Sequence, residues 1–442
     1  MSDSNHQSPE AIARHVHDSH PEGGLFANLD WRTAVAPFPL GKANAKRIEK
    51  LGRVLLQFYR AVNLLYRKSV EGKQPTWVAD WLDRGKPTDL IELQRARAFK
   101  NELPRVIRPD LLLTDNGFSV TELDSVPGGI GLTAWLNQTY AAAGADVLGG
   151  ASGMIDGFSG VFGDAQNVQV VVSEESATYR PEMEWIAEQI SSRKINVHDT
   201  SFTDFQPGDA VYRFFELFDL KNVSNFEQIF DLAAEQTIRL TPPPKTIFEE
   251  KLLFALLWNR NLAEFWRQEL GGRFFEDLKS ISPYSWLIDP TPLPPNAAFP
   301  GLDLTDWHQL KTLSQKQRDL ILKVSGFSET AWGARGVYLG SDLSTEDWSE
   351  AVDLAIRSAE ASPHVLQRFH KPRRVETQWF DLDSGDLKTM QARARICPYY
   401  FVHGEGDAAR ARFSGALATL CPADKKIIHG MTDAILTPCS AD

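Results

Sequence analysis

Residues Ile107–Val126, IRPDLLLTDNGFSVTELDSV, decide the prediction of the fold. Two extended runs flank Asp115-Asn116-Gly117, and an Asn-Gly pair between such runs is a strong short-range signal for a β-hairpin. Successive residues of a strand point to opposite faces, so residues two apart share a face. Glu122 and Asp124 therefore extend the row that begins at Phe118, and two acids stand where a buried apolar row would continue.

These two carboxylates predict a metal site. Buried carboxylates without partners are costly, and two that lie side by side repel each other. A divalent cation relieves both penalties, and Mg2+ usually takes one or two carboxylates together with phosphate oxygens. The alternative is that the strand emerges into solvent at Glu122 and Asp124.

The residues on either side of the pair are candidates for holding an anion. Ser125-Val126-Pro127-Gly128-Gly129-Ile130-Gly131 follows the pair, and small residues let backbone N–H groups approach an anionic group closely. An ordinary turn is the alternative for the glycines. Arg108 and Asp110 open the hairpin and are further candidates.

The composition is that of a globular protein with two or three domains: 442 residues, of which 43% are hydrophobic and 24% charged. The formal net charge is −11, and the sequence has no long basic run. Nucleic acid and anionic membrane surfaces are therefore disfavoured as partners.

We predict that the protein is cytoplasmic. Cys397, Cys421 and Cys439 form no C-x-x-C pair, which is typical of a reducing compartment. The polar N-terminus lacks the apolar segment of a secretory signal, and no apolar run approaches the roughly 20 residues that cross a bilayer. Residues 1–25 hold four of the ten histidines. A flexible polar tail is the main interpretation, and a metal site is the alternative.

The pattern of apolar residues, glycines and prolines divides the chain into four regions. The first is the N-terminal tail, residues 1–25. Region 26–164 contains an amphipathic helix from Gly41 to Val70 and the hairpin. Region 165–240 alternates the strand Val168–Val172, a helix from Arg180 to Ser192 and two further strands, which predicts a small α/β subdomain with parallel pairing. The glycine-rich stretch from Gly144 to Gly163, at the end of region 26–164, precedes the strand Val168–Val172 instead of following one, which excludes a dinucleotide-binding fingerprint.

Region 241–442 begins at the prolines of Thr241–Lys245, which cannot continue a helix. Its expected elements are a helix from about Ile247 to Leu270, a proline-rich connector over Ser282–Pro300, the strand Leu320–Lys323, a helix over Glu346–Ala361, the strand Val365–Phe369, and a hairpin that turns at Asp383-Ser384-Gly385.

Lys323 ends an apolar strand and leads into a loop, a combination that suits phosphate capture. The ammonium supplies charge, and the loop supplies backbone amides and mobility. A lysine that reaches past a sheet edge into solvent is the alternative. The loop contains Gly326, Glu329, Gly333, Arg335 and Gly336.

Three other strands carry residues that could contact a substrate or a nucleotide. Arg393 and Arg395 alternate with apolar residues on Thr389–Cys397, so they share one face. Arg213 lies within a short strand and could hold an anion. The strand Val365–Phe369 could offer backbone groups to the edge of an adenine ring.

Taken in order, these motifs resemble the circularly permuted branch of the ATP-grasp superfamily. The likeness is above all to eukaryotic-type glutathione synthetases and, more distantly, to glutathionylspermidine synthase-like ligases. The best local match runs from Arg108-Pro109-Asp110 through the hairpin to Glu122-Leu123-Asp124-Ser125 and the pair Gly128-Gly129. It implies an α/β (α+β) ATP-grasp fold, ATP and Mg2+ as cofactors, and region 165–240 as an inserted substrate-binding subdomain.

The resemblance also assigns roles to residues. Lys251 resembles the first ATP lysine, Lys323 the second, and Val365–Phe369 the adenine hinge. The predicted site comprises the metal ligands Glu122, Asp124 and Glu329; the catalytic residues Arg108, Arg335 and Arg395; the nucleotide-binding residues Lys251, Lys323, Gly326, Gly333, Gly336, Gln367 and Arg368; and the substrate-binding residues Asp110, Ser125, Gly128, Gly129, Arg213 and Arg393.

The sequence departs from the family's motifs in three places, and these departures narrow the predicted function and site. Asp124 stands where the family usually has Asn, although an oxygen ligand is kept. Glu329 lies farther beyond Lys323 than the family's acid does, which leaves its role as a ligand open. Ser414–Cys421 lacks the arginine that family members place near a similar glycine-rich strand, so glutathione synthesis itself is not expected.

The predicted function is an ATP-dependent carboxylate–amine ligase that forms an amide or peptide bond through an acyl phosphate. Its substrates would be small molecules: an amino acid, a short peptide or a polyamine. A small-molecule kinase and a catalytically silent nucleotide- or peptide-binding protein are the alternatives. The sequence leaves the oligomeric state open, with a homodimer as one option.

Overall fold

The computed structural model describes residues 8–23, 31–331, 335–428 and 433–442. The chain divides into two compact units: unit 1 comprises Met1–Leu56, Ala96–Pro243 and Lys371–Asp442, and unit 2 comprises Gln57–Arg95 and Pro244–His370. One division falls between Pro243 and Pro244, within the proline run that marked a boundary in the sequence. The C-terminal part of the expected region 241–442 belongs to unit 1, so that region is divided between the units.

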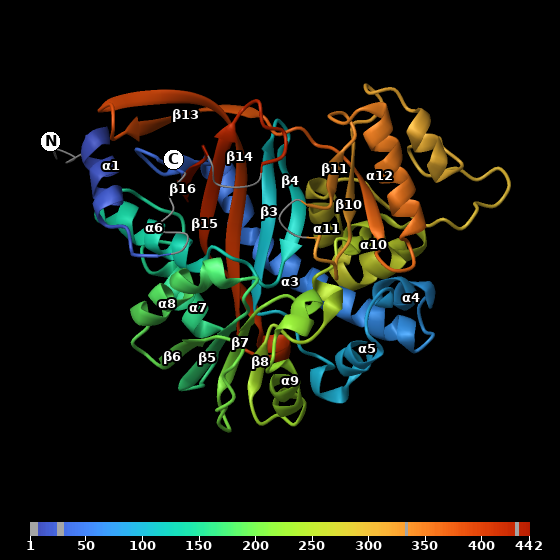
Figure 1. Cartoon of the computed structure of the whole chain (residues 1–442), viewed down its shortest axis with the longest axis horizontal. Helices are drawn as coiled ribbons and strands as arrows, with labels where there is room; N and C mark the ends of the chain where they lie inside the picture. The colour runs from blue at the N-terminus through green and yellow to red at the C-terminus, as the bar shows by residue number, and fades with distance from the viewer. Residues whose placement is uncertain (1–7, 24–30, 332–334, 429–432) are drawn as a thin grey trace. The chain divides into compact units, whose positions relative to one another are not determined.

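Unit 1 contains an eight-stranded sheet with the order β1-β16-β15-β14-β3-β4, in which β13 also pairs with β14 and β2 with β16 (Figure 1). One part of β14 pairs with β13 and a later part with β3. The sheet therefore joins the early hairpin to strands from the end of the chain. The strands are β1 (Arg32–Thr33), β2 (Phe38–Pro39), β3 (Val106–Thr114), β4 (Gly117–Asp124), β13 (Arg374–Asp381), β14 (Asp386–His403), β15 (Arg410–Pro422) and β16 (Ile435–Ser440).

Strands β3 and β4 confirm the predicted hairpin, but its register shifts between Asp110 and Leu111, so Glu122 and Asp124 share one face without continuing the row of Phe118 as expected. Thr114 pairs with Gly117, which leaves Asp115 and Asn116 as a two-residue turn. Gly117 has a φ of 113°, a conformation that residues with a Cβ rarely adopt, so glycine suits this position. The hairpin expected at Asp383-Ser384-Gly385 is also confirmed, by the antiparallel pairing of β13 with β14.

Helices of unit 1 pack on the large sheet. Helix α6 (Ile130–Ala142) contacts β15 and β16, and α7 (Gly153–Gly160) contacts β14 and β15. Helix α3 (Lys42–Val70), whose residues up to Leu56 belong to unit 1, confirms the amphipathic helix that the sequence predicted. Its Ile48 carbonyl accepts a 2.6 Å hydrogen bond from the Tyr400 hydroxyl of β14. Across the described parts of both units, no helix has the length and apolar character to span a membrane.

The N-terminal stretch differs from the expected polar tail. Pro9–Asp18 forms helix α1, which buries Ala13 and Val16. The helix packs against α6, and the indole N–H of Trp135 donates a 3.1 Å hydrogen bond to the Ser19 carbonyl. Ala13 and Val16, three positions apart on one side of the helix, are therefore buried against other parts of the chain. The expected boundary after residue 25 lies outside the described residues.

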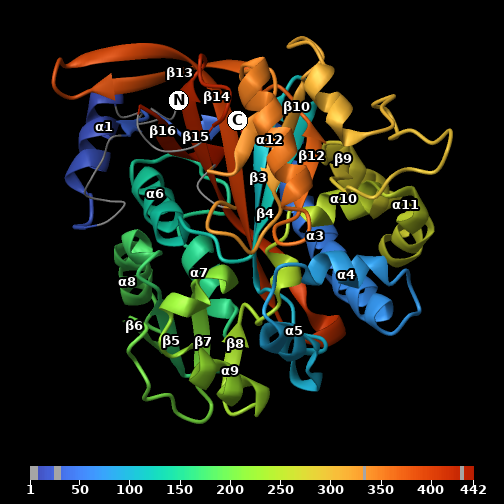
Figure 2. The ribbon, with the colours of Figure 1, turned by 45° about the vertical axis from the view of Figure 1, so that its right-hand side comes forward.

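A second sheet of unit 1 has the order β6-β5-β7-β8 and is parallel throughout, which confirms the predicted parallel pairing (Figure 2). Strand β5 lies between β6 and β7 in the sheet, and the chain continues from β5 to β6 and then to β7 on the other side of β5. The loops that follow β5 and β7 therefore begin at the same edge of the sheet. The elements are β5 (Asn167–Val172), α8 (Arg180–Gln189), β6 (Lys194–His198), β7 (Ala210–Phe214), α9 (Phe226–Ala234) and β8 (Arg239–Thr241).

Unit 2 contains an antiparallel sheet with the order β11-β10-β12-β9. The expected strands at Leu320 and Val365 are confirmed. The single helix expected from Ile247 to Leu270 is wrong, because Asn259 has extended backbone angles and its side chain accepts the N–H of Asn261, which starts a new turn. The elements are α4 (Trp77–Asp83), α5 (Thr88–Arg95), α10 (Leu252–Trp258), α11 (Ala263–Ile281), β9 (Ser285–Leu287), β10 (Leu320–Val324), β11 (Val337–Leu339), α12 (Thr345–Arg357) and β12 (His364–Arg368).

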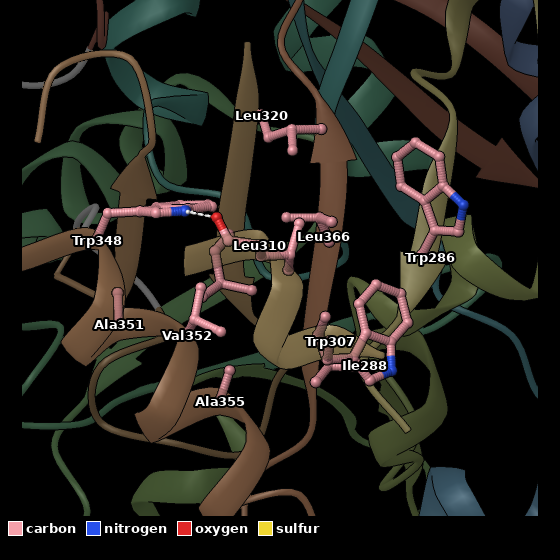
Figure 3. Close-up of a cluster of buried hydrophobic side chains, with 11 residues drawn as sticks. Trp286, Ile288, Trp307, Leu310, Leu320, Trp348, Ala351, Val352, Ala355 and Leu366 are labelled. Carbon is pink, nitrogen blue, oxygen red and sulfur yellow. Dashed lines mark hydrogen bonds between the residues drawn. The ribbon is translucent and has the colours of Figure 1, made fainter. Parts of the chain in front are cut away.

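One face of this sheet packs on α12 to form a hydrophobic cluster (Figure 3). Leu320 and Leu366 come from paired strands, and Trp348 comes from the helix. The indole N–H of Trp348 donates to the Leu310 carbonyl at 2.9 Å, so the buried ring leaves no unpaired donor. Alternation then turns the odd-numbered residues of β10, including Lys323, to the other face.

We expect Leu322→Ala to lower the free energy of unfolding of unit 2 by about 2–5 kcal/mol, because Leu322 is fully buried in this cluster. The matched control is Leu354→Ala on α12, whose side chain is 40% exposed and should change stability by no more than about 0.5 kcal/mol. Urea denaturation followed by tryptophan fluorescence measures both. Equal effects of the two substitutions would contradict the assignment of the core.

Candidate functional site

The predicted metal site lies on one face of the β3–β4 hairpin. Arg108 pairs with Asp124, and Asp110 pairs with Glu122, so all four side chains share that face. The neighbouring strand β14 adds Arg395, which donates to Asp110. The sheet thus brings together three acids and two arginines that the sequence had indicated separately.

Arg108 contacts three groups at once. Its Nε lies 3.1 Å from Asp110 Oδ1, and its Nη2 lies 3.0 Å from Asp124 Oδ2. Its Nη1 donates to the Gly128 carbonyl at 3.2 Å. Burial alone would lower the pKa of Arg108, but the two carboxylates raise it well above its usual value. The guanidinium therefore stays charged and joins both strands to the loop after β4.

Asp110 interacts with both arginines, through an ion pair with Arg108 and a hydrogen bond from Arg395. Arg395 Nη1 donates to its Oδ2 at 3.1 Å, and the Cys397 thiol donates to its Oδ1 at 3.3 Å. Burial raises the pKa of Cys397 to about 12, so the thiol remains a proton donor. Asp110 is 3% exposed. It holds both guanidinium groups in place, and its predicted contact with substrate stays a prediction.

Asp124 and Glu122 bring two further carboxylates to this face. Asp124 Oδ1 accepts the Val126 N–H at 2.8 Å. Burial raises the pKa of Asp124 to about 6; Arg108 opposes this rise, and the charge of Glu122 adds to it. A divalent cation against these carboxylates would favour their ionised form, so the donor set fits Mg2+.

The pair can supply only part of a coordination shell. Among the described residues, no group of three or more His, Cys, Asp and Glu side chains could hold a metal ion. Phosphate oxygens and water would complete the shell, as is usual for Mg2+. Glu329, the predicted third ligand, is an exposed residue of unit 2, and its role stays a prediction.

The small residues after Asp124 pack tightly against two tyrosines. The Gly128 carbonyl accepts the Tyr399 hydroxyl at 2.7 Å. A Cβ on Gly128 would lie 2.3 Å from the Tyr179 ring, and one on Gly129 would lie 2.6 Å from the Tyr399 hydroxyl. Gly129 also has a φ of 85°. Because a side chain fits at neither position, the path of this loop is fixed.

The amides of the same loop face an anion that the protein supplies itself. The N–H groups of Gly129 and Leu132 donate to the two carboxylate oxygens of Glu182 at 2.6 and 3.0 Å. Glu182 comes from α8 and is fully buried. Burial raises its pKa to about 7, although these hydrogen bonds oppose the rise. The anionic group that the sequence predicted near these glycines is, at Gly129, an internal carboxylate.

Two buried hydroxyls near the cluster are unpaired among the described residues. Ser125, predicted to contact substrate, is 1% exposed, and Tyr212 of β7 is fully buried. Burial raises the pKa of Tyr212 well above its usual value, and the charges of Asp124 and Glu182 also raise it. Buried hydroxyls without partners are uncommon, so both are candidates for contact with water or a bound molecule.

Two of the predicted substrate arginines bind backbone carbonyls. Arg213 is 1% exposed, and its guanidinium donates to three carbonyls at 2.6, 3.1 and 3.1 Å. Arg393 is 3% exposed and donates to the Lys425 carbonyl at 3.2 Å. It shares the face of Arg395, as alternation predicted. Both side chains hold chain segments together, and their contact with substrate stays a prediction.

In unit 2, β10 and β12 place two predicted nucleotide residues on one face. Lys323 and Gln367 both lie opposite the cluster of Figure 3. Lys323 is 5% exposed, and the Gln367 amide donates to the Ser285 hydroxyl at 2.9 Å. Arg368 points to the other face and donates to the Gly301 carbonyl at 2.5 Å.

Lys251 is tied to the loop that follows Lys323. Its backbone N–H donates to the Ser325 carbonyl at 2.9 Å, and its Nζ donates to the Ala331 carbonyl at 2.8 Å. The two predicted ATP lysines are therefore connected through this loop, although they lie 72 positions apart in the sequence.

The described glycines of this loop lie close to other backbone. A Cβ on Gly326 would lie 2.3 Å from the Glu249 carbonyl oxygen, and one on Gly336 would lie 2.7 Å from that of Thr330. Arg335 is exposed. Gly333, which the sequence also assigned to the nucleotide, lies outside the described residues.

Comparison with solved structures identifies the architecture. The chain is similar to a glutathione synthetase-like effector (GSS30) from Globodera pallida, solved in its apo form, with a TM-score of 0.59 and 11% identity over 98% of this chain and 97% of that chain. The chain has a glutathione synthetase-like fold. The predicted mixed α/β architecture of this type is thereby confirmed.

A second solved structure resembles the chain only weakly. It is a candidate gamma-glutamylcysteine synthetase from Methylobacillus flagellatus KT, with a TM-score of 0.38 and 11% identity over 87% of this chain and 88% of that chain. No family model and no curated protein matches the sequence.

Sequence reasoning missed Glu182, Tyr179 and Tyr399. Tyr399 is four residues from Arg395 on one strand, so the alternation of β14 could have placed it on the same face. Glu182 gave no local signal, because the amides that it binds lie 50 and 53 residues away.

Glu182→Gln should change the pH dependence of the stability of unit 1. The pKa of about 7 in the folded protein lies above the ordinary 4.5, so the folded state binds more protons between these values. The stabilising contribution of Glu182 is thus full below pH 4.5 and is lost as the pH rises through 7, by about 3 kcal/mol. Urea denaturation from pH 4.5 to 8 should show wild type losing this amount relative to the variant; parallel curves would exclude the assignment.

Proposed function

We propose that the chain is an ATP-dependent carboxylate–amine ligase of the circularly permuted ATP-grasp type. The reaction would form an amide or peptide bond between small substrates, such as an amino acid, a short peptide or a polyamine. The observation that carries the proposal is the hairpin face where Glu122 and Asp124 lie beside Arg108 and Arg395. The glutathione synthetase-like fold supports the architecture alone, because a fold does not fix an activity.

In this proposal unit 1 binds Mg2+ and stabilises the phosphoryl group that is transferred. Glu122 and Asp124 would hold Mg2+, which when bound neutralises charge on the phosphates. Arg108 and Arg395 would stabilise negative charge that develops on the transferred phosphoryl group. Asp110 forms an ion pair with Arg108 and accepts a hydrogen bond from Arg395, so both guanidinium groups are oriented before the substrate binds.

Unit 2 would bind ATP. Lys251 and Lys323 would contribute positive charge to the phosphates, and Arg335 would add to it from the loop. The strand that carries Gln367 would meet the edge of the adenine ring. The support for these roles is the common face of Lys323 and Gln367 and the hydrogen bonds that join Lys251 to the loop.

The reaction would proceed in two displacements. An oxygen of the substrate carboxylate attacks the γ-phosphorus of ATP, ADP leaves, and an acyl phosphate forms. The amine nitrogen then attacks the acyl carbon and loses a proton, and inorganic phosphate leaves. A reducing compartment such as the cytoplasm suits the three buried free cysteines.

An ADP-release screen over amino acids, short peptides and polyamines, with mass detection of condensed products, tests the proposal. A ligase releases ADP only when acid and amine are both present and yields a condensed product. A kinase would yield a stable phosphorylated product without the amine. A binding protein would bind ATP and release no ADP with any mixture.

Glu122→Gln and Asp124→Asn should each abolish Mg2+-dependent ADP formation, because each removes a charged oxygen ligand. The matched control is Asp115→Asn, an exposed carboxylate in the turn of the same hairpin, which should keep full activity. Steady-state ADP formation across Mg2+ concentrations measures all three. Normal turnover of both Glu122→Gln and Asp124→Asn would refute the metal site.

Lys323→Met and Lys251→Met should each raise the dissociation constant of a non-hydrolysable ATP analogue by about 10- to 100-fold, the effect of losing a charge-assisted hydrogen bond. Isothermal titration calorimetry measures the constant. Lys311→Met is the control, since Lys311 pairs with Asp353 at 2.9 Å in the same unit. A control that weakened binding as much as the two variants would show that the effect is not local.

A further inference from the structure

A buried ion pair in unit 2 lies outside the residues assigned so far. Lys86 Nζ and Glu250 Oε1 are 2.7 Å apart, and their side chains are 1% and 2% exposed. Lys86 belongs to the turn between α4 and α5. Its neighbour Gly85 has a φ of 71°, and a Cβ there would lie 1.9 Å from the Ala361 carbonyl oxygen, so glycine is required and the turn is fixed.

Glu250 also contacts the loop that follows β10. Its second carboxylate oxygen accepts the hydroxyl of Ser325. The Ser325 hydroxyl in turn accepts the N–H of Leu252 at 2.8 Å, and Ser325 is fully buried. The first residue of the loop is therefore joined both to the ion pair and to the start of α10.

The loop backbone continues against the same segment. A Cβ on Gly326 would lie 2.9 Å from Glu250 Cδ. Phe327 has a φ of 43°, in the left-handed region that is strained for a residue with a Cβ, and Lys86 Nζ lies 5.9 Å from the centre of its ring. A strained backbone persists only where its surroundings hold it. The loop is thus fixed over its first three residues.

Stability alone does not explain this pair. The cost of removing two charges from water roughly cancels their attraction, and apolar side chains of similar volume often stabilise a fold equally well. A hydrogen-bonded buried pair supplies a fixed position instead. Here the pair fixes the position of Ser325, which lies two residues after Lys323. The Ser325 carbonyl accepts the N–H of Lys251.

We propose that Lys86 and Glu250 are positioning residues for the nucleotide phosphates. The pair holds Ser325, and through Ser325 it fixes the backbone that carries Lys323 and Lys251. Neither side chain of the pair contacts the nucleotide. The inference rests on the proposed function, because it takes the two lysines to bind phosphate.

Three variants separate positioning from stability. Lys86→Met/Glu250→Leu replaces the pair with apolar side chains and leaves no unpaired charge. Ser325→Ala keeps the pair but cuts its link to the loop. Lys311→Met, which breaks the partly exposed pair with Asp353 in the same unit, is the control.

Two quantities are measured on each full-length variant. Each is compared with the urea midpoint of unfolding, which reports the stability of that variant. One is the dissociation constant of a non-hydrolysable ATP analogue with Mg2+, and the other is amide hydrogen exchange over residues 325–331 without nucleotide. The double variant and Ser325→Ala should each raise the constant by about 10- to 100-fold and accelerate exchange. The variant that combines all three substitutions should add little, because both changes cut the same link. The control should leave both quantities unchanged.

An unchanged dissociation constant in the double variant would overturn the inference, even if exchange accelerated, because the pair would then be structural only. Additive effects in the combined variant would also overturn it. If the double variant does not fold, Ser325→Ala alone decides. A wild-type protein that does not bind the analogue would refute the proposed function, whereas binding that the variants leave intact would refute only the inference.

Discussion

The ion pairs of Arg108 are the interaction on which the site of unit 1 depends. A guanidinium whose side chain is only 16% exposed needs several partners, because removing a charge from water costs more than one pair returns. Arg108 has them on its own strand, across the hairpin and in the following loop: Asp110, Asp124 and the Gly128 carbonyl. A slip of the hairpin by one residue would turn this side chain to the opposite face, so the charged cluster and the strand register support each other.

The same requirement explains Glu182. Helix α6 starts in a buried loop, and the first amides of a helix have no acceptor within the helix. Glu182 supplies one and joins helix α8 to the loop after Asp124. Since Gly129 and Leu132 are already paired with this carboxylate, we expect the positive charge for a substrate anion to come from Arg108 and Arg395.

The likeness to the Globodera pallida effector covers nearly the whole length of both chains at 11% identity. Such a likeness can persist because a fold requires apolar patterning and suitable turns, and many sequences meet these requirements. A catalytic activity requires more than a fold does, because particular side chains must lie together in one place. The ligase proposal therefore depends on Glu122 and Asp124, together with the lysines of unit 2, and the architecture only supports it.

The sequence by itself determined the features that depend on near neighbours: the turn at Asp115-Asn116-Gly117, the common face of Glu122 and Asp124, helix α3, and the parallel α/β subdomain. Only the tertiary structure decided which groups meet on those faces. It brought Glu182 to Gly129 across 53 residues, and it gave helix α1 a surface where a polar tail had been expected. The physical reason is that periodicity reports the face to which a side chain points, whereas the partner on that face is set by burial and by segments that are distant in sequence.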